Sequence, residues 1–273
     1  METEGASTDF KEAERTGWSD KAPVYDDFAG RITAGAVEAL LDAAAVRRGT
    51  RFLDICCGTG HLAAAAAARG AEATGIDFAA PMVAAAKRRH PGLAFTEGDA
   101  EALAFPDGAF DAAACAFGVL HLADPDRALA EARRVLRPGG RFAFAVWAPP
   151  PAHEFFPLVG EAIAAHGAPV ALPPAPPMFR FADHAEARRS MEAAGFAGVT
   201  VEDLPLTWAI DGPRGVLAYV EKCTMRIAMV LDRQTPAVRA RIHDAIVDGA
   251  SGFARDGASR VAWPAVRGRG GAP

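Results

Sequence analysis

The sequence predicts a doubly wound α/β fold, in which helices cover both faces of a parallel β-sheet. Between Arg51 and Trp147, short apolar runs alternate with alanine-rich or amphipathic segments, the pattern of strands followed by helices. The first run ends at the turn Gly58-Thr59-Gly60, and an alanine-rich helix follows directly. Of the 273 residues, 51% are apolar and 23% charged, which is typical of a globular protein with one large domain or one domain and a lobe.

The expected strands are short apolar runs, and the expected helices have apolar residues at helical spacing or are rich in alanine. Pro81 opens one helix, where a proline is well tolerated, and Gly70 ends another. In such a sheet, ligands bind at the carboxyl ends of the strands. The expected strands are 51–57, 73–78, 93–97, 110–117 and 141–147, and the expected helices are 31–46, 61–69, 81–89 and 125–136.

Composition changes at Ala148 and divides the chain into further parts. Residues 149–182 are rich in proline around one helical piece, 155–166, and we expect them to form a lid insertion after the fifth strand. The remaining parts are defined by their patterns along the chain. They are a flexible or helical segment 1–22, a cofactor-binding core 23–148, a C-terminal part of the core 183–266 with inserted helices, and a disordered tail 267–273.

Within the C-terminal part, Asp183 is a helix-capping residue and Gly195 a helix stop. The elements expected there follow from the same periodicities as in the core. They are a helix at 183–194, a strand at 199–210, helices at 213–231 and 235–253, and a strand at 259–266.

Charge and cysteine usage exclude several classes of protein. The net charge of −5 does not favour nucleic acid or an anionic membrane as a partner, and no run of about 18 apolar residues predicts a membrane span. The N-terminus lacks the pattern of a signal peptide. The four cysteines form no C-x-x-C pair, so we expect no metal site and reduced thiols in a cytoplasmic protein.

The glycine turn by itself has two interpretations. The spacing Gly58-x-Gly60-x-x-Ala63, with Asp77 further on, fits the loose fingerprint of dinucleotide-binding proteins, in which the acid binds a ribose hydroxyl. An NAD-dependent oxidoreductase is therefore one alternative. Such short patterns also occur by chance, so the elements that follow the turn decide between the alternatives.

Five ordered motifs make the chain resemble the class I S-adenosylmethionine-dependent methyltransferases, in the subgroup that includes the ubiquinone and menaquinone methyltransferases. The similarity covers Tyr25–Ala148, and two of its motifs, Gly98-Asp-Ala and Leu-Arg-Pro-Gly-Gly, are not part of the NAD pattern. The resemblance implies a Rossmann-like methyltransferase fold with S-adenosylmethionine as cofactor. The motifs are Leu53-Asp-Ile-Cys-Cys-Gly-Thr-Gly60, Gly75-Ile-Asp77, Gly98-Asp-Ala100, Phe110-Asp111 and Arg134-Val-Leu-Arg-Pro-Gly-Gly140.

The resemblance assigns the methionine and ribose parts of the cofactor to the first two motifs. Asp54 would hold the ammonium through water or order the loop, and Asp77 would accept hydrogen bonds from the ribose diol. Tyr25 and Arg31 would lie over the cofactor, with Arg31 near its carboxylate. The backbone of the turn would lie against the methionine portion, at Cys57, Gly58, Thr59 and Gly60.

The adenine would be held by the later motifs. Phe78 and Met82 offer flat or polarizable surface, Asp99 would accept from the adenine amino group, and the Ala100 amide would donate to the ring. Phe117 would close the other side. Five of the proposed cofactor residues also have a plain structural alternative: Asp54 and Asp77 as loop or turn acids, and Phe78, Met82 and Phe117 as core.

His121 is the candidate for a general base. It follows the fourth strand, in the loop that faces the acceptor in this family, and imidazole titrates near neutrality. His153 and His166 of the insertion are weaker candidates that would reach the site only on closure. The insertion also supplies apolar side chains for an acceptor pocket, or simply for packing the lid: Phe155, Phe156, Leu158, Met178, Phe179, Phe181 and, further on, Trp208.

The expected function is transfer of a methyl group from S-adenosylmethionine to O, N or C of a small, aromatic or apolar metabolite. Two alternatives stay open: a protein that binds the cofactor but catalyses a non-methylating reaction such as cyclisation, and the NAD-dependent oxidoreductase. The expected partner is the small-molecule acceptor, and the expectations allow for a homodimer.

Overall fold

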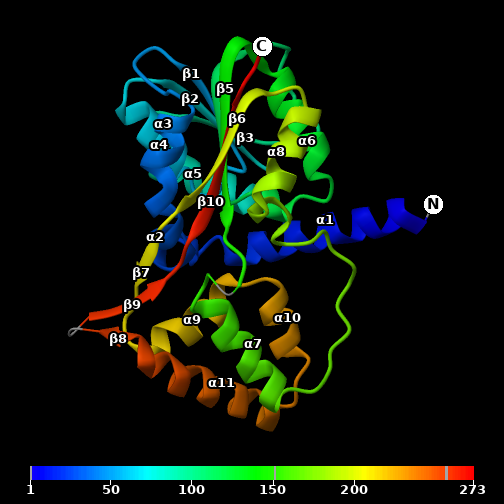
Figure 1. Ribbon diagram of the computed structural model, residues 1–273, viewed down its shortest axis with the longest axis vertical. Coiled ribbons are helices and arrows are strands. Elements are labelled where there is room, and N and C mark those ends of the chain that lie inside the picture. Colours follow the sequence, from blue (N-terminus) through cyan, green and yellow to red (C-terminus); the bar gives the residue numbers. More distant parts are fainter. Residues whose placement is uncertain (1, 151, 256–257) are drawn as a thin grey trace.

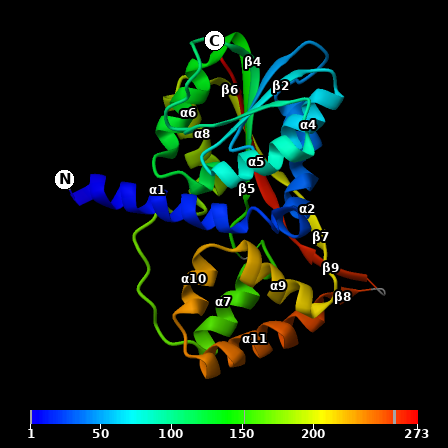
Figure 2. The same cartoon turned by 180° about the vertical axis from the view of Figure 1, so that it is seen from behind.

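The computed structural model describes residues 2–150, 152–255 and 258–273. Its upper part is a sheet with helices on both faces, and its lower part is a group of helices with a small sheet (Figure 1). Helix α1 (Glu2–Lys21) crosses the molecule between the two parts, as the view from behind also shows (Figure 2). Among the described residues, no helix has the length and apolar character needed to cross a membrane.

The central sheet has seven strands in the order β3-β2-β1-β4-β5-β10-β6. The first five pair in parallel, and β10 runs antiparallel to both of its neighbours. The chain order reverses between β1 and β4, so the carboxyl ends of these two strands form the crevice in which such sheets bind ligands. The strands are β1 (Arg51–Ile55), β2 (Glu72–Asp77), β3 (Ala94–Glu97), β4 (Phe110–Ala116), β5 (Leu136–Trp147), β6 (Ala197–Leu204) and β10 (Ala265–Gly271).

Alternation along the strands divides the core into two layers. In β4, Ala112 and Ala114 belong to the core cluster on one face, whereas Ala113 and Cys115 belong to the cluster on the other. Both faces are covered, which is why this strand is apolar from Ala112 to Ala116, after the acid Asp111 near its start. Helices α3 (Val37–Ala43), α4 (His61–Ala68) and α5 (Ala80–Arg89) supply the first layer, and α6 (Pro125–Arg134) and α8 (His184–Ala193) supply the second. The predicted doubly wound α/β class is confirmed.

The chain before the sheet is more broken than its periodicity predicts. The segment 1–22 is helical as α1, while the single helix expected at 31–46 forms as α2 (Ala29–Thr33), a short 3₁₀ turn (Ala34–Ala36) and α3. A 3₁₀ turn, Tyr25–Asp27, precedes α2. These short elements carry the chain from α1 to the first face of the sheet.

The prediction of a disordered tail at 267–273 is wrong, because these residues form most of β10. They lie between β5 and β6, in the interior of the sheet. A Cβ added at Gly268 would come within 2.4 Å of the Phe144 ring, and one at Gly270 within 2.9 Å of the Phe196 Cβ. The glycines are therefore required by the close approach of Phe144 on β5 and of Phe196, which directly precedes β6. In the sequence alone, the same glycines are typical of a flexible chain terminus.

The lower part is built by residues after β5. Helices α7 (Phe155–His166), α9 (Pro213–Cys223), α10 (Arg226–Asp232) and α11 (Pro236–Ala250) pack together, beside a sheet of β7 (Thr207–Ala209), β9 (Ala258–Ala262) and β8 (Ala254–Arg255). Three expectations need correction here. The helix expected at 213–231 is interrupted by extended backbone at Thr224. The strand expected at 199–210 is two strands in different sheets, and so is the strand expected at 259–266, which forms as β9 and the start of β10.

Candidate active site

The glycine turn after β1 adopts the conformation that its residues predict. Gly58 and Gly60 have φ of +51° and +88°, in the left-handed region that favours glycine. At Gly60, a Cβ would also lie 2.7 Å from the Phe95 ring. Cys56, at the end of β1, has a left-handed φ of +58° although it is not glycine, a strained geometry that is concentrated at functional sites.

Asp77, the last residue of β2, holds this turn. Its Oδ2 accepts a hydrogen bond from the Gly58 amide and its Oδ1 accepts one from the Ala79 amide, both at 2.9 Å. Burial raises the pKa of Asp77 to about 6, against the opposing effect of these amides. A carboxylate has about four acceptor positions, so the fixed side chain can still accept a hydrogen bond from a ligand.

Asp54 has one satisfied and one unsatisfied carboxylate oxygen. Oδ2 accepts from the Ala63 amide at 2.9 Å in the first turn of α4, whereas Oδ1 is buried without a partner among the described residues. The side chain is 1% exposed, and burial raises its pKa to about 8. A buried, unpaired carboxylate oxygen at a glycine turn fits a cationic group of a ligand, such as an ammonium.

A cavity of about 460 Å³ lies at the carboxyl ends of β1, β2 and β4, and we call it the cofactor cleft. It continues past Asp77 and Phe78 to Asp99 and Ala100, at the end of β3. Seven of the residues singled out in the sequence come together around the first cavity. They are Tyr25, Gly58, Asp77, Phe78, Met82, Phe117 and His121.

Helix α1 covers this cleft through three residues that the sequence did not single out. Lys11 Nζ contacts Asp99 Oδ2 at 2.5 Å and Glu101 Oε2 at 2.9 Å, and the Trp18 indole lines the cleft. Glu14 Oε2 lies 2.9 Å from His121 Nδ1 and accepts from Trp18 Nε1 at 3.1 Å. Positions 11, 14 and 18 lie on one face of a helix, a spacing that could have identified them as a packed face.

Phe117 and His121 form the wall beyond β4. Phe117 has a left-handed φ of +59°, its amide donates to the Ala145 carbonyl at 2.9 Å, and its ring stacks on Trp147 with centroids 3.8 Å apart. His121 ends a 3₁₀ turn, Val119–His121. Its ring and that of Trp18 pack in a T-shaped arrangement with their centroids 4.8 Å apart. The wall is thus built from β4, β5 and α1.

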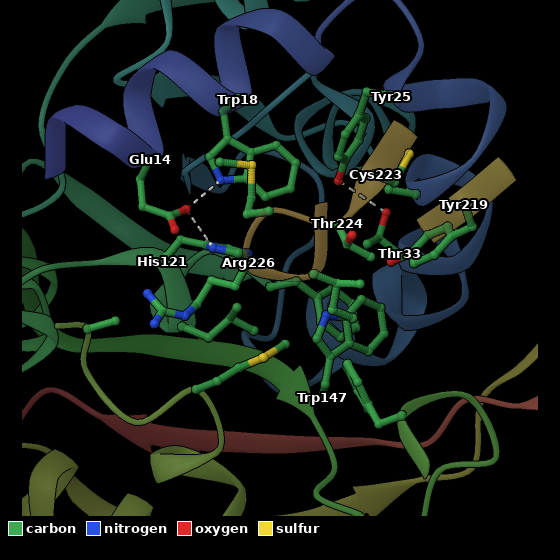
Figure 3. A pocket seen from close by; sticks show the side chains of 18 of the residues that line it. Glu14, Trp18, Tyr25, Thr33, His121, Trp147, Tyr219, Cys223, Thr224 and Arg226 are labelled. Atoms are coloured by element: carbon green, nitrogen blue, oxygen red, sulfur yellow. Dashed lines mark hydrogen bonds and ion pairs between the residues drawn. The ribbon is translucent and has the colours of Figure 1, made fainter. Parts of the chain in front are cut away.

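A second cavity of about 850 Å³ lies on the other side of this wall, and we call it the acceptor cavity (Figure 3). Trp18, Tyr25, Phe117 and His121 line both cavities, so the two spaces meet at these four side chains. The acceptor cavity is mostly apolar and aromatic. Its further lining residues include Phe10, Leu120, Trp147, Phe155, Phe156, Met178, Tyr219, Met225, Ile227 and, as a cation, Arg226.

Only part of the predicted acceptor lining is brought together. Phe155, Phe156 and Met178 line the acceptor cavity, but the other four side chains are not among its lining residues: Leu158, Phe179, Phe181 and Trp208. Phe181 packs on Phe144 in the core and Trp208 on Tyr219 and Trp263.

Several other candidates lie apart from the cleft. Arg31 is 59% exposed and pairs with Asp211 at 3.7 Å, so the structure does not bring it to the glycine turn. Thr59 is buried and donates to Asp26. His153 is buried among Trp147, Phe156 and Trp263, and His166 is exposed at the end of α7. Cys57 is buried beside the turn. Within the described part of the chain, no group of three or more His, Cys, Asp or Glu could hold a metal ion.

Comparison with known proteins agrees with this geometry. A family model described as a methyltransferase domain matches residues 53–144. The chain is 43% identical over 148 residues to a demethylmenaquinone methyltransferase of Thermus thermophilus, covering 50% of this chain and 67% of the relative. It is 44% identical over 122 residues to one of Beutenbergia cavernae, covering 45% of this chain and 51% of the relative. The chain thus spans about half to two thirds of the length of these relatives.

A solved structure extends the comparison to the whole fold. The crystal structure of the YcgJ protein from Bacillus subtilis superposes with a TM-score of 0.55 over 86% of this chain and 97% of that chain, at 22% identity. Such a likeness shows the shared architecture, and the sequence relatives show the family. The chain belongs to the class I S-adenosylmethionine-dependent methyltransferases, and its cofactor is S-adenosylmethionine.

Proposed function

We propose that the protein transfers the methyl group of S-adenosylmethionine to a small aromatic acceptor of the hydroquinone type. The observation that carries this proposal is the junction of the two cavities. An apolar, aromatic cavity meets the cofactor cleft at Trp18, Tyr25, Phe117 and His121. An acceptor ring in the first space would therefore be adjacent to a ligand in the second, and proximity is the main contribution that a methyltransferase makes.

Residues of the cleft, and Asp54 in a small cavity that shares Tyr25 and Cys56 with it, fit the parts of the cofactor. The unpartnered Oδ1 of Asp54 suits the ammonium, and the remaining lone pairs of Asp77 suit the ribose diol. Phe78 and Met82 offer surface to the adenine, and Asp99 an acceptor to its amino group. When bound, the cofactor supplies a methyl group already activated by a sulfonium. The protein's task is then to align the acceptor, exclude water and manage one proton.

The acceptor class follows from the lining and from the relatives. The aromatic walls suit a fused or substituted ring, with edge-on and stacked contacts to side chains such as Phe156 and Trp147. Both relatives are named for demethylmenaquinone. Only the reduced, hydroxyl-bearing form of a quinone is electron-rich enough to attack a methyl carbon, so a base near the junction is useful. His121 is the histidine that occupies this place.

The test uses purified protein with S-adenosylmethionine and a short-tailed 1,4-naphthoquinone kept reduced. We expect a product heavier by one methyl group together with an equal amount of S-adenosylhomocysteine, and no product from the oxidised quinone. Replacing Met178, which lines the acceptor cavity and not the cofactor cleft, by Lys should raise the acceptor KM while leaving S-adenosylhomocysteine affinity unchanged. Consumption of the acceptor without S-adenosylhomocysteine release would instead favour the cyclisation alternative.

A further inference from the structure

We propose that Glu14 of helix α1 is the positioning residue for His121, holding its imidazole in the orientation and tautomer of a general base toward the acceptor. This inference rests on the proposed function, because it assigns a role within that same site. It concerns an N-terminal helix that lies outside the segment matched by the methyltransferase-domain model.

The geometry of the pair is specific. Glu14 Oε2 lies 2.9 Å from His121 Nδ1, and the two residues are 107 positions apart in the chain. The same oxygen accepts a hydrogen bond from Trp18 Nε1, which fixes the carboxylate from its own helix (Figure 3). Glu14 is 5% exposed, and burial of an acidic side chain in an apolar lining is costly unless it has such partners.

The contact selects the histidine tautomer. A carboxylate only accepts, so the imidazole must donate its Nδ1–H, and Nε2 is left with its lone pair. Among the described residues, Nε2 has no hydrogen-bond partner, and His121 lines both the cofactor cleft and the acceptor cavity. The arrangement corresponds to a base oriented by a third group.

The charges around His121 come from several elements. Asp77 faces the ring from the end of β2, and Arg226 of α10 lines the same acceptor cavity. Lys11 faces it from α1, where it is neutralised by Asp99 and Glu101. Glu14 is the carboxylate in direct contact with the imidazole, so it provides the strongest stabilisation of the imidazolium that forms during proton transfer.

The proposed step is a proton transfer. The O–H bond of the acceptor hydroxyl breaks, its proton binds Nε2 of His121, and the electron pair stays on the oxygen, from which it activates that oxygen or the conjugated ring carbon. Glu14 stays ionised and stabilises the resulting imidazolium. If the ring carbon takes the methyl group, the proton on that carbon is lost to solvent when aromaticity returns.

The variants are Glu14→Gln, which removes the charge at nearly constant shape, and Glu14→Asp as the conservative rescue. Glu12→Gln is the matched control, since Glu12 lies on the same helix, is exposed and pairs only with Arg15 among the described residues. The first readout needs no turnover: the ¹⁵N resonances of His121 in the S-adenosylhomocysteine complex. We expect an Nδ1-protonated ring in the parent protein and in Glu12→Gln, and a mixed or reversed tautomer in Glu14→Gln. An unchanged tautomer in Glu14→Gln overturns the proposal.

The second readout is kinetic. Glu14→Gln should lower kcat roughly tenfold to hundredfold with little change in acceptor KM, because the variant loses the group that orients the base and not the acceptor site. Glu14→Asp should recover part of the loss. Adding Glu14→Gln to His121→Ala should cost nothing further. If the loss of kcat in the double variant equals the product of the two single losses, Glu14 acts independently of His121 and the proposal is overturned. If the parent protein methylates no acceptor while the resonances respond as expected, it is the proposed function that fails and not the pair.

Discussion

The carboxylate of Asp77 accepts the backbone N–H of Gly58 at 2.9 Å, which ties the end of β2 to the turn that follows β1. Its other oxygen accepts the Ala79 amide, so the side chain cannot rotate away from the cleft. The acid expected to bind the ribose therefore also fixes the conformation of the turn. Replacing it should disturb the ligand and the loop together.

Asp77→Ala should weaken S-adenosylhomocysteine binding by about 1–3 kcal/mol, through loss of the acceptors for the ribose and for the Gly58 amide. Isothermal titration calorimetry measures this loss directly. Asp203→Asn, an exposed acid that pairs with His184 far from the cleft, is the control and should bind normally. Unchanged affinity in Asp77→Ala would refute the ribose assignment.

Asp54 should make the stability of the ligand-free protein fall as pH rises. Burial raises its pKa to about 8 in the folded state, from 3.8, so the folded state holds the proton more tightly than the unfolded state. This contribution is complete below about pH 4 and is lost as pH rises to about 8. Asp54→Asn should flatten the dependence and stabilise the free protein at pH 8.5 by about 2–4 kcal/mol, as measured by urea unfolding.

The same residue predicts a proton linkage in binding. If Oδ1 of Asp54 receives the cofactor's ammonium, binding requires the ionised carboxylate, and S-adenosylhomocysteine affinity should rise with pH up to about 8. Calorimetry at pH 7 in buffers of different ionisation enthalpy should detect proton release. Asp54→Asn should bind more weakly and release fewer protons, and equal release in both proteins would contradict the assignment.

Lys11→Met should loosen helix α1. The ammonium contacts Asp99 and Glu101, which attaches the helix to the adenine end of the cleft, and Met keeps most of the length of the side chain without the charge. We expect faster amide exchange across α1 and S-adenosylhomocysteine affinity reduced by about 1–2 kcal/mol. The tautomer of His121 depends on α1 lying across the cleft. In Lys11→Met at saturating ligand we expect α1 to lie there, so the ¹⁵N resonances of His121 should match those of the parent protein.

Gly268→Ala should destabilise the fold by about 1–3 kcal/mol, since the new Cβ would lie 2.4 Å from the Phe144 ring in the middle of the sheet. Gly92→Ala is the control, because nothing lies within 4 Å of its Cβ position. Urea unfolding compares the two. Combining Gly268→Ala with Phe144→Leu should recover part of the lost stability. If Gly268→Ala alone has the free energy of unfolding of the parent protein, β10 is not an interior strand.

The sequence predicted the elements from Arg51 to Trp147 closely, because their signals are local. Period-2 and helical patterns, a glycine turn and helix-stopping glycines each act over a few residues. For the same reason Gly58, Asp77 and Phe78 could be assigned to one end of the sheet. Parallel strands place their carboxyl ends at one edge, so position along the chain was sufficient for these residues.

Residues outside this pattern could not be placed in the same way. Arg31 was expected at the cofactor carboxylate but pairs with Asp211, because α2 is a short helix whose orientation depends on its packing. The glycines of the strand at 265–271 are required by the Phe144 ring on β5 and by the Cβ of Phe196, just before β6. These contacts join residues far apart in the chain, so the local sequence around Arg31 or around 265–271 does not predict them.

The sequence alone determined the α/β class, the glycine turn and the acids that point to S-adenosylmethionine. The tertiary structure decided what surrounds them: the acceptor cavity from α7, α9 and α10, and the cover of the cleft by Lys11, Glu14 and Trp18 of α1. The physical reason is the range of the interactions. Turns and periodicities arise between near neighbours, whereas the contact of Glu14 with His121 joins residues 107 positions apart and exists only once the helix has packed across the sheet.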